Sequence, residues 1–253
     1  ELGLDKPIHE QYITYVTGLL KGDLGTSLRT KRPVAVEVSN RYANTAKLTL
    51  LALAWSTIVG VLLGVWSGRH RSRWQDYTGM TLAVSGISLP SFWVGFMLIM
   101  VFSVNLKWFP TTGADSLKSL VLPSIALGSS IAAIIARFTR SSIIEVLKDD
   151  YIRTARAKGL RERVVVWKHA FRNAMISVVT VVGLQFGFLL GGSVVTESVF
   201  AFPGLGSLLV ESVNYRDYPA IQSLILIFSL HFVVINLIVD VLYAVLNPEI
   251  QLD

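Results

Sequence analysis

The chain has 253 residues, no cysteine and a formal net charge of +6; 52% of its residues are hydrophobic and only 16% are charged, against about 25% charged in an average soluble domain. The lack of cysteine excludes a disulfide scaffold and thiolate metal sites. The positive charge does not indicate a nucleic-acid partner, because the basic residues lie in segments that flank long uncharged stretches.

Five long uncharged windows predict membrane-spanning helices. A helix needs roughly 20 mostly apolar residues to cross the hydrocarbon layer, whereas helices of soluble proteins keep a polar face toward water. Each window reaches or nearly reaches that length. We therefore expect an all-α integral membrane protein with spans at about 48–68, 78–104, 120–137, 174–198 and 219–246.

The opening segment, residues 1–44, has a different character from the rest. It is nearly balanced in charge, is amphipathic around His9–Leu20, and then turns polar from Lys21 to Gly25. We expect it to form an external lobe with short helices, followed by a transmembrane domain over residues 45–247.

Glycine recurs at every fourth position in the first and fourth predicted spans. Glycines spaced in this way lie along one helix face and let the backbone of a neighbouring helix approach closely. Glycine is also common in membrane helices in general. However, each of the two spans has three glycines on one face, which favours two close helix–helix seams. The two sets are Gly60, Gly64 and Gly68, and Gly183, Gly187 and Gly191.

Pro90 interrupts the second predicted span. A proline inside a helix leaves one backbone carbonyl without its partner and tends to kink the helix, and nearby serines can satisfy the freed groups. A bend here is consistent with a residue set that lines a pathway, with a gating hinge, or with a static kink.

The segment 138–172 is too long for a simple connection between spans. Asp149 and Asp150 stand where a helix start favours acidic residues, and Gly159 suits the left-handed conformation that ends a helix. We therefore expect a short, capped, basic helix between two spans; a solvated charged connector is the alternative. The helices expected in this segment are Ser141–Leu147, Asp150–Lys158 and Val164–Asn173.

The distribution of basic residues predicts the orientation, because Lys and Arg are enriched in cytoplasmic loops. The segment 138–172 carries nine Lys or Arg against four acidic residues, and 69–77 is also basic, whereas 105–120 and 201–219 are nearly neutral. We therefore expect the amino-terminal segment outside and the tail, residues 248–253, in the cytoplasm. An odd span count with an external amino end is unusual, so we expect six spans in the full chain, the first preceding this sequence.

Charged side chains inside a bilayer are costly and are usually paired or functional. Asp240 lies near the cytoplasmic end of the last span, and Arg137 and Arg140 lie near that of the third. We predict that Asp240 pairs with one of these arginines, the alternative being a hydrated carboxylate at the interface.

Several uncharged polar side chains are candidates for lining a substrate pathway. Each of them alone is also consistent with a hydrogen bond between helices. The candidates are Ser88, Ser91, Gln185, Ser193, Gln222 and Asn236.

Two motifs in the segment 138–172 are more specific, YIRTARAKG at Tyr151–Gly159 and HAFRNA at His169–Ala174. They resemble the cytoplasmic loop of the permease subunits of binding-protein-dependent ABC importers, most closely the first-position permeases of the oligopeptide, dipeptide, nickel and glutathione branch. The resemblance covers essentially the whole chain; Ser177, where the family usually has proline, is a departure. Further matching motifs are Gly22–Ser27, Phe138–Ser142, Phe202–Gly206, Arg216–Pro219 and Asn247–Pro248.

This resemblance implies a type I ABC importer transmembrane domain whose short cytoplasmic helix docks into a cleft on an ATPase subunit. It also implies an external gate element that contains Phe202, Pro203, Gly204 and Gly206. The residues implied in ATPase coupling are Asp150, Tyr151, Arg153, Thr154, Ala155, Ala157, Lys158 and Gly159.

The partners that the resemblance implies are a second, homologous permease, two ATPase subunits and an extracytoplasmic substrate-binding protein, assembled in a bacterial inner membrane. The chain has no G-x-x-x-x-G-K-[ST] loop, so we expect ATP and Mg to bind in partner subunits. We expect no catalytic residue, metal or cofactor in this chain. ATP binding would then rock the spans between inward-open and outward-open states.

The expected cargo is short peptides, with glutathione among them, and nickel or a metal chelate is the alternative within the family. A secondary transporter is an alternative of another class and would need ion-coupling charges within the membrane. A membrane-embedded enzyme is a third, but the sequence has neither an H-E-x-x-H nor a G-x-S-x-G motif.

Overall fold

The computed structural model describes the backbone of residues 7–246 and the side chains of residues 7–241. The described secondary structure is helical except for one isolated bridge between Thr26 and Pro33. The predicted tail, residues 248–253, lies outside the described residues. The elements are α1 (Ile8–Leu20), α2 (Val34–Arg69), α3 (Trp74–Ser88), α4 (Ser91–Leu98), η1 (Ile99–Asn105), α5 (Leu117–Val146), α6 (Asp150–Ala157), α7 (Glu162–Val164), η2 (Val165–Ala170), α8 (Phe171–Val199), α9 (Leu205–Asn214) and α10 (Tyr218–Leu246).

The expected all-α membrane architecture is confirmed. Four helical stretches are long and apolar enough to cross a membrane, namely α2, α5, the continuous run from α7 to α8, and α10. The remaining predicted window corresponds to α3 and the α4–η1 helix, which count as a fifth span if the bent pair is taken together.

Helix α2 begins at Val34, well before the predicted start of the first span, and continues for 36 residues. Pro33 precedes it, and proline suits the entry to a helix because its φ is fixed. No glycine or proline interrupts residues 34–59, so the helix continues beyond the apolar window. Of the lobe predicted for residues 1–44, the described part therefore consists of α1 and the connection 21–33, because α2 includes residues 34–44.

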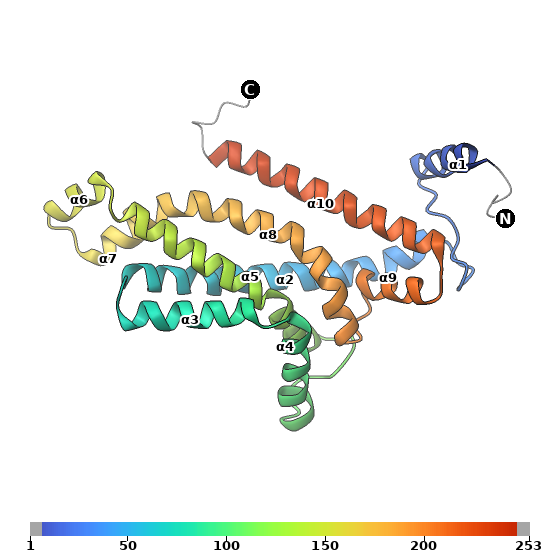
Figure 1. Ribbon diagram of the computed structural model, residues 1–253, viewed down its shortest axis with the longest axis horizontal. Coiled ribbons are helices and arrows are strands. Elements are labelled where there is room, and N and C mark those ends of the chain that lie inside the picture. The colour runs from blue at the N-terminus through green and yellow to red at the C-terminus, as the bar shows by residue number, and fades with distance from the viewer. Residues whose placement is uncertain (1–6, 247–253) are drawn as a thin grey trace.

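Helix α5 lies in the centre of the bundle and contacts α2, α3, α4 and α8 (Figure 1). The largest buried cluster is formed mainly by α5, with Leu48 from α2 and Leu189 from α8. This central position makes α5 the element that connects α2, α3, α4 and α8, whereas α10 packs mainly on α8.

The first glycine set forms the predicted seam between α2 and α5. A Cβ atom on Gly60 would lie 2.7 Å from the carbonyl oxygen of Ala132, and one on Gly64 would lie 2.5 Å from that of Ala136. Contacts this short are impossible for a real side chain, so the two backbones approach as closely as they do only because glycine occupies these positions.

The second glycine set forms a seam only in part. A Cβ on Gly183 would lie 2.4 Å from Val239, and one on Gly187 would lie 3.2 Å from Phe232, both on α10. No atom lies within 4 Å of the corresponding position on Gly191. The α8–α10 seam therefore ends before Gly191, and the prediction of three glycines in contact is wrong there.

The predicted kink at Pro90 is a complete break. Leu89 is extended, with φ −92° and ψ 127°, because the residue before a proline is disfavoured in the helical region. Helices α3 and α4 are separated by a bend of 100°. Figure 1 shows α3 running beside α2 while α4 turns steeply away.

Candidate functional site

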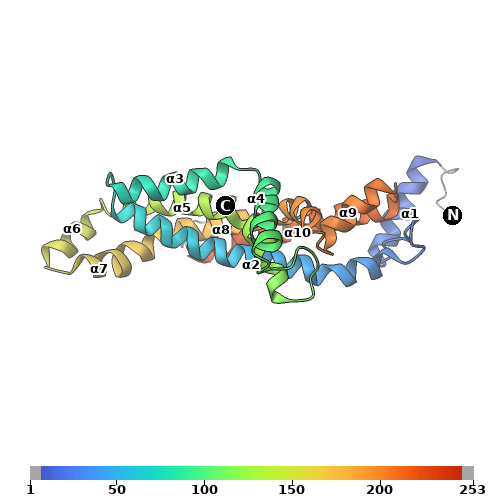
Figure 2. The ribbon, with the colours of Figure 1, turned by 90° about the horizontal axis from the view of Figure 1, so that it is seen from below.

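Two groups of predicted site residues lie at opposite ends of the molecule. Helix α6 lies at one extreme of the long axis, and α1 and α9 lie toward the other, as Figures 1 and 2 both show. We refer to these as the α6 end and the α9 end.

The predicted short helix at the α6 end is confirmed, with bounds Asp150–Ala157. Asp149 precedes it in an extended conformation and Asp150 lies in its first turn, where an acidic side chain favours the helix. Gly159 has φ +76° and its N–H donates to the carbonyl of Arg156 at 2.9 Å, which closes the helix end in the expected left-handed conformation.

The inner face of α6 is anchored to its own chain. Ile152 is 0% and Ala155 is 7% exposed, and both pack against Val165 and Ala170 of η2. Ala155 lies one helical turn from Ile152 on the same face, so it packs inward and not on the exposed face of α6; its role in coupling stays a prediction. The other predicted coupling residues are exposed, namely Asp150, Tyr151, Arg153, Thr154, Ala157, Lys158 and Gly159.

Two polar contacts connect α6 to the start of the following span. The Asn173 side-chain amide donates to the Tyr151 hydroxyl at 2.8 Å. The Arg156 guanidinium donates to both carboxylate oxygens of Glu162, at 3.2 and 2.8 Å. Force applied to the outer face of α6 would therefore reach α8 directly.

At the α9 end, residues 200–204 form a turn between α8 and α9. Phe202 is buried, and the Asn44 amide of α2 donates to the carbonyl of Pro203 at 2.9 Å. A Cβ on Gly204 would lie 2.3 Å from the Glu197 carboxylate, and one on Gly206 would lie 2.5 Å from the Cα of Val194. The predicted gate motif thus requires its glycines because the turn is pressed against α8.

The charged residue Glu197 is fully buried beneath this turn. Its carboxylate accepts hydrogen bonds from the Thr45 hydroxyl at 2.7 Å and from the Ser207 N–H at 3.0 Å, and Thr45 accepts one from the Leu205 N–H at 2.8 Å. Because Gly204 has no side chain to cap α9, Glu197 and Thr45 satisfy the free N–H groups at its start. This network joins α2, α8 and α9.

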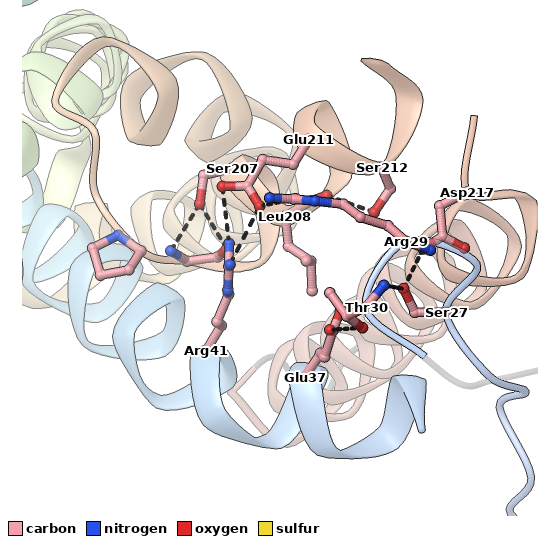
Figure 3. Close-up of polar contacts among 12 residues, drawn as sticks. Ser27, Arg29, Thr30, Glu37, Arg41, Ser207, Leu208, Glu211, Ser212 and Asp217 are labelled. Atoms are coloured by element: carbon pink, nitrogen blue, oxygen red, sulfur yellow. Dashed lines mark hydrogen bonds and ion pairs between the residues drawn. The ribbon is translucent and has the colours of Figure 1, made fainter. Parts of the chain in front are cut away.

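A strap, defined here as residues 24–33, fastens the start of α2 to α9 and α10 (Figure 3). The Ser27 hydroxyl and the Leu28 N–H donate to Asp217. Glu211 forms ion pairs with Arg29 at 2.9 Å and with Arg41 at 3.3 Å. Sequence reasoning missed these contacts; the only signal was that Gly22–Ser27 and Arg216–Pro219 were both family motifs.

The hydrogen bonds of the strap change the acidity of Asp217. Burial raises the pKa of this carboxyl, but the bonds from Ser27 and from the N–H groups of Leu28 and Arg29 outweigh burial and hold the pKa below its usual range. The strap is therefore held by hydrogen bonds to the ionised form of Asp217.

The predicted ion pair of Asp240 with Arg140 is wrong, because Arg140 binds Asp76 instead. The guanidinium donates to the two Asp76 oxygens at 2.5 and 2.7 Å. Asp240 is exposed, and no ion pair within the described side chains joins it to Arg137 or Arg140. Arg140 pairs with Asp76 rather than Asp240 because Asp76 lies on α3, which packs directly against α5.

The pathway candidates lie in different surroundings. Ser193 is fully buried and its hydroxyl donates to the carbonyl of Leu190 at 2.8 Å, so it faces no open surface here. Ser88 and Gln222 are exposed, while Ser91, Gln185 and Asn236 are half-buried; their role in a pathway stays a prediction. Among the described residues, no three His, Asp or Glu side chains are placed to hold a metal ion.

Comparison with known families agrees with this architecture. Residues 60–252 match the family described as the inner membrane component of binding-protein-dependent transport systems. The chain belongs to this family. It is therefore a multi-pass permease of the inner membrane, and the resemblance drawn from its motifs is confirmed.

Named relatives of this permease match nearly all of its length. Proteins from Salmonella typhimurium and Escherichia coli, both named glutathione transport system permease protein GsiC, are 55% identical to it over 251 residues. The match covers 99% of this chain and 82% of each relative.

Solved structures show the fold of this permease. An inward-facing MetNI methionine ABC transporter matches with a TM-score of 0.72 and 17% identity, over 83% of this chain and 96% of that one. An amino acid ABC transporter with histidines matches with a TM-score of 0.65 and 15% identity, over 90% and 97%. The fold is the transmembrane domain of a type I ABC importer.

Proposed function

We propose that this permease forms one half of a translocation pathway for short peptides, with glutathione as the foremost cargo, and that a second, homologous permease forms the other half. The observation that carries the proposal is the 55% identity to glutathione permeases over 99% of the chain. An external binding protein delivers the cargo, in keeping with the family description.

Two ATPase subunits supply the energy and hold ATP and Mg, so that this chain needs no cofactor. The ATPase contacts the outer face of α6. Ile152 on the opposite face is anchored, Tyr151 contacts α8 and Arg156 contacts α7. These contacts support the role, because a docking helix must pass movement to the spans.

The α6 end lies in the cytoplasm and the α9 end outside. The basic residues around α6 support this orientation. The binding protein then meets the α9 end, where the gate turn at 200–204 lies between α8 and α9.

Uptake by the reconstituted four-subunit transporter tests the proposal. Proteoliposomes that enclose ATP and Mg are supplied with the binding protein and labelled glutathione. We expect uptake that requires ATP and is reduced by unlabelled glutathione. Uptake of nickel but not of glutathione or dipeptides would contradict the proposal, and so would glutathione uptake driven by an ion gradient without ATPases.

A further inference from the structure

A groove of about 780 Å³ runs along α3 beside α5. It is in the size range of sites for small organic ligands. From Tyr77 to Ser88 the helix rises roughly 17 Å, enough to accommodate an extended tripeptide of about 10 Å. The groove is lined mainly by α3, with two arginines from α5: Asp76, Tyr77, Met80, Thr81, Val84, Ser85, Ser88, Leu89, Arg137 and Arg140.

The two arginines in this groove are not equivalent. Arg140 is neutralised by Asp76, which it binds with two parallel hydrogen bonds. Arg137 is exposed and forms no ion pair within the described part of the chain. It thus presents an uncompensated guanidinium, the group that binds carboxylates in a two-pronged geometry.

The two serine hydroxyl groups in the groove have the opposite polarity. The Ser85 hydroxyl donates to the carbonyl of Thr81 at 2.8 Å, and that of Ser88 donates to the carbonyl of Val84 at 2.9 Å. Each hydroxyl has one hydrogen, so both oxygens present only lone pairs to the groove. These positions accept N–H groups such as an ammonium or an amide.

We propose that the groove is a binding station for the cargo inside the permease, with a carboxylate of a short peptide on Arg137 and its ammonium or amide N–H groups on Ser85 and Ser88. This inference rests on the proposed function. It gives the permease its own preference for peptides with a free carboxylate, in addition to the preference of the binding protein. The break at Pro90 follows directly after the hydroxyl end of the groove.

Photolabelling tests the station in the assembled transporter without the binding protein. The complex is held in nanodiscs, and the probe is glutathione that carries a diazirine. We expect label within residues 77–89, and we expect unlabelled glutathione to compete about tenfold better than its diamide, which lacks the carboxylates. Absence of label from residues 77–89 and 137–140 of the wild-type chain would overturn the proposal.

A pair of arginine substitutions assigns the carboxylate. Arg137→Gln is expected to reduce labelling about tenfold, because it removes one charged two-pronged contact. Arg73→Gln removes the same charge from an exposed position near the start of α3 that does not line the groove, and labelling should not change. Equal labelling in the two variants would refute the role of Arg137.

Lipid composition and uptake separate the other outcomes. If the effect of Arg137→Gln appears only in nanodiscs with anionic lipid, the guanidinium binds a lipid headgroup and the cargo assignment is wrong. If the wild-type transporter takes up glutathione but is not labelled, the station fails while the proposed function stands. If it takes up no peptide at all, the proposed function fails.

Discussion

At the scale of single residues, the short distance between α2 and α5 depends on the glycines at their contact. The position of a Cβ on Gly64 is occupied by the Ala136 carbonyl and by Thr139. Backbone atoms cannot move aside as the end of a flexible side chain can. The seam therefore tolerates no larger residue without separation of the two helices.

Gly64→Ala is expected to destabilise the permease, by about 1–3 kcal/mol as for other overpacked interiors. Thermal unfolding in detergent measures the loss. Gly191→Ala is the matched control, because no atom lies within 4 Å of the added methyl group. Equal unfolding temperatures for the two variants would show that the seam is looser than described.

Gly159→Val should uncouple ATP hydrolysis from transport. With φ +76°, a non-glycine residue costs about 1–2 kcal/mol, and a β-branched one is least tolerated. The end of α6 would shift although nothing lies within 4 Å of the added Cβ. The ratio of cargo moved to ATP hydrolysed measures the effect; Gly159→Asn, which tolerates this conformation, should keep the ratio, and an unchanged ratio in the valine variant would count against the role of α6.

At the scale of elements, local signals were readable from sequence and long-range partners were not. The caps of α6 lie within a few residues of the helix, so Asp149 and Gly159 predicted its bounds closely. The partner of Arg140 depends on which helix packs against α5, and charge spacing alone did not favour Asp76 over Asp240. The strap joins Ser27 to a residue 190 positions away, a contact that no periodicity indicates.

The strap should detach from α9 and α10 in acid. The folded pKa of Asp217 is lower than its unfolded value, so its contribution to stability is complete above the unfolded value of about 3.9 and is lost as the pH falls through the folded pKa. Hydrogen exchange of residues 24–33 is followed from pH 7 downward and divided by the intrinsic exchange rate at each pH; the resulting protection factors should fall in that window.

The variant Asp217→Asn provides the control for this pH dependence. It has no carboxylate to protonate, so exchange in the strap should already be fast at pH 7 and should lack the step in acid. A wild-type strap that stays protected below the folded pKa, at a pH where Asp217 is seen to be protonated, would show that other contacts, such as Arg29 with Glu211, suffice to hold it.

At the scale of the whole molecule, the two ends of the bundle face different compartments under the proposed orientation. The sequence has no cysteine, so one introduced thiol reports one position. Lys148→Cys lies beside α6, and Lys21→Cys follows α1; both positions are exposed. In spheroplasts, a membrane-impermeant maleimide should label position 21 at once and position 148 only after permeabilisation. The reverse pattern would show that the permease has the opposite orientation.

The central place of α5 has a mechanical consequence. With 30 residues this helix is roughly 45 Å long. Its last residue, Val146, packs against the cluster that contains Ile152 and Ala155 of α6. A tilt of about 5° at that end would carry the far tip sideways by roughly 4 Å, by simple proportion to the length of the helix. Under the proposed coupling to an ATPase, α5 would act as a lever, and a small movement at α6 would become a displacement as wide as a peptide backbone.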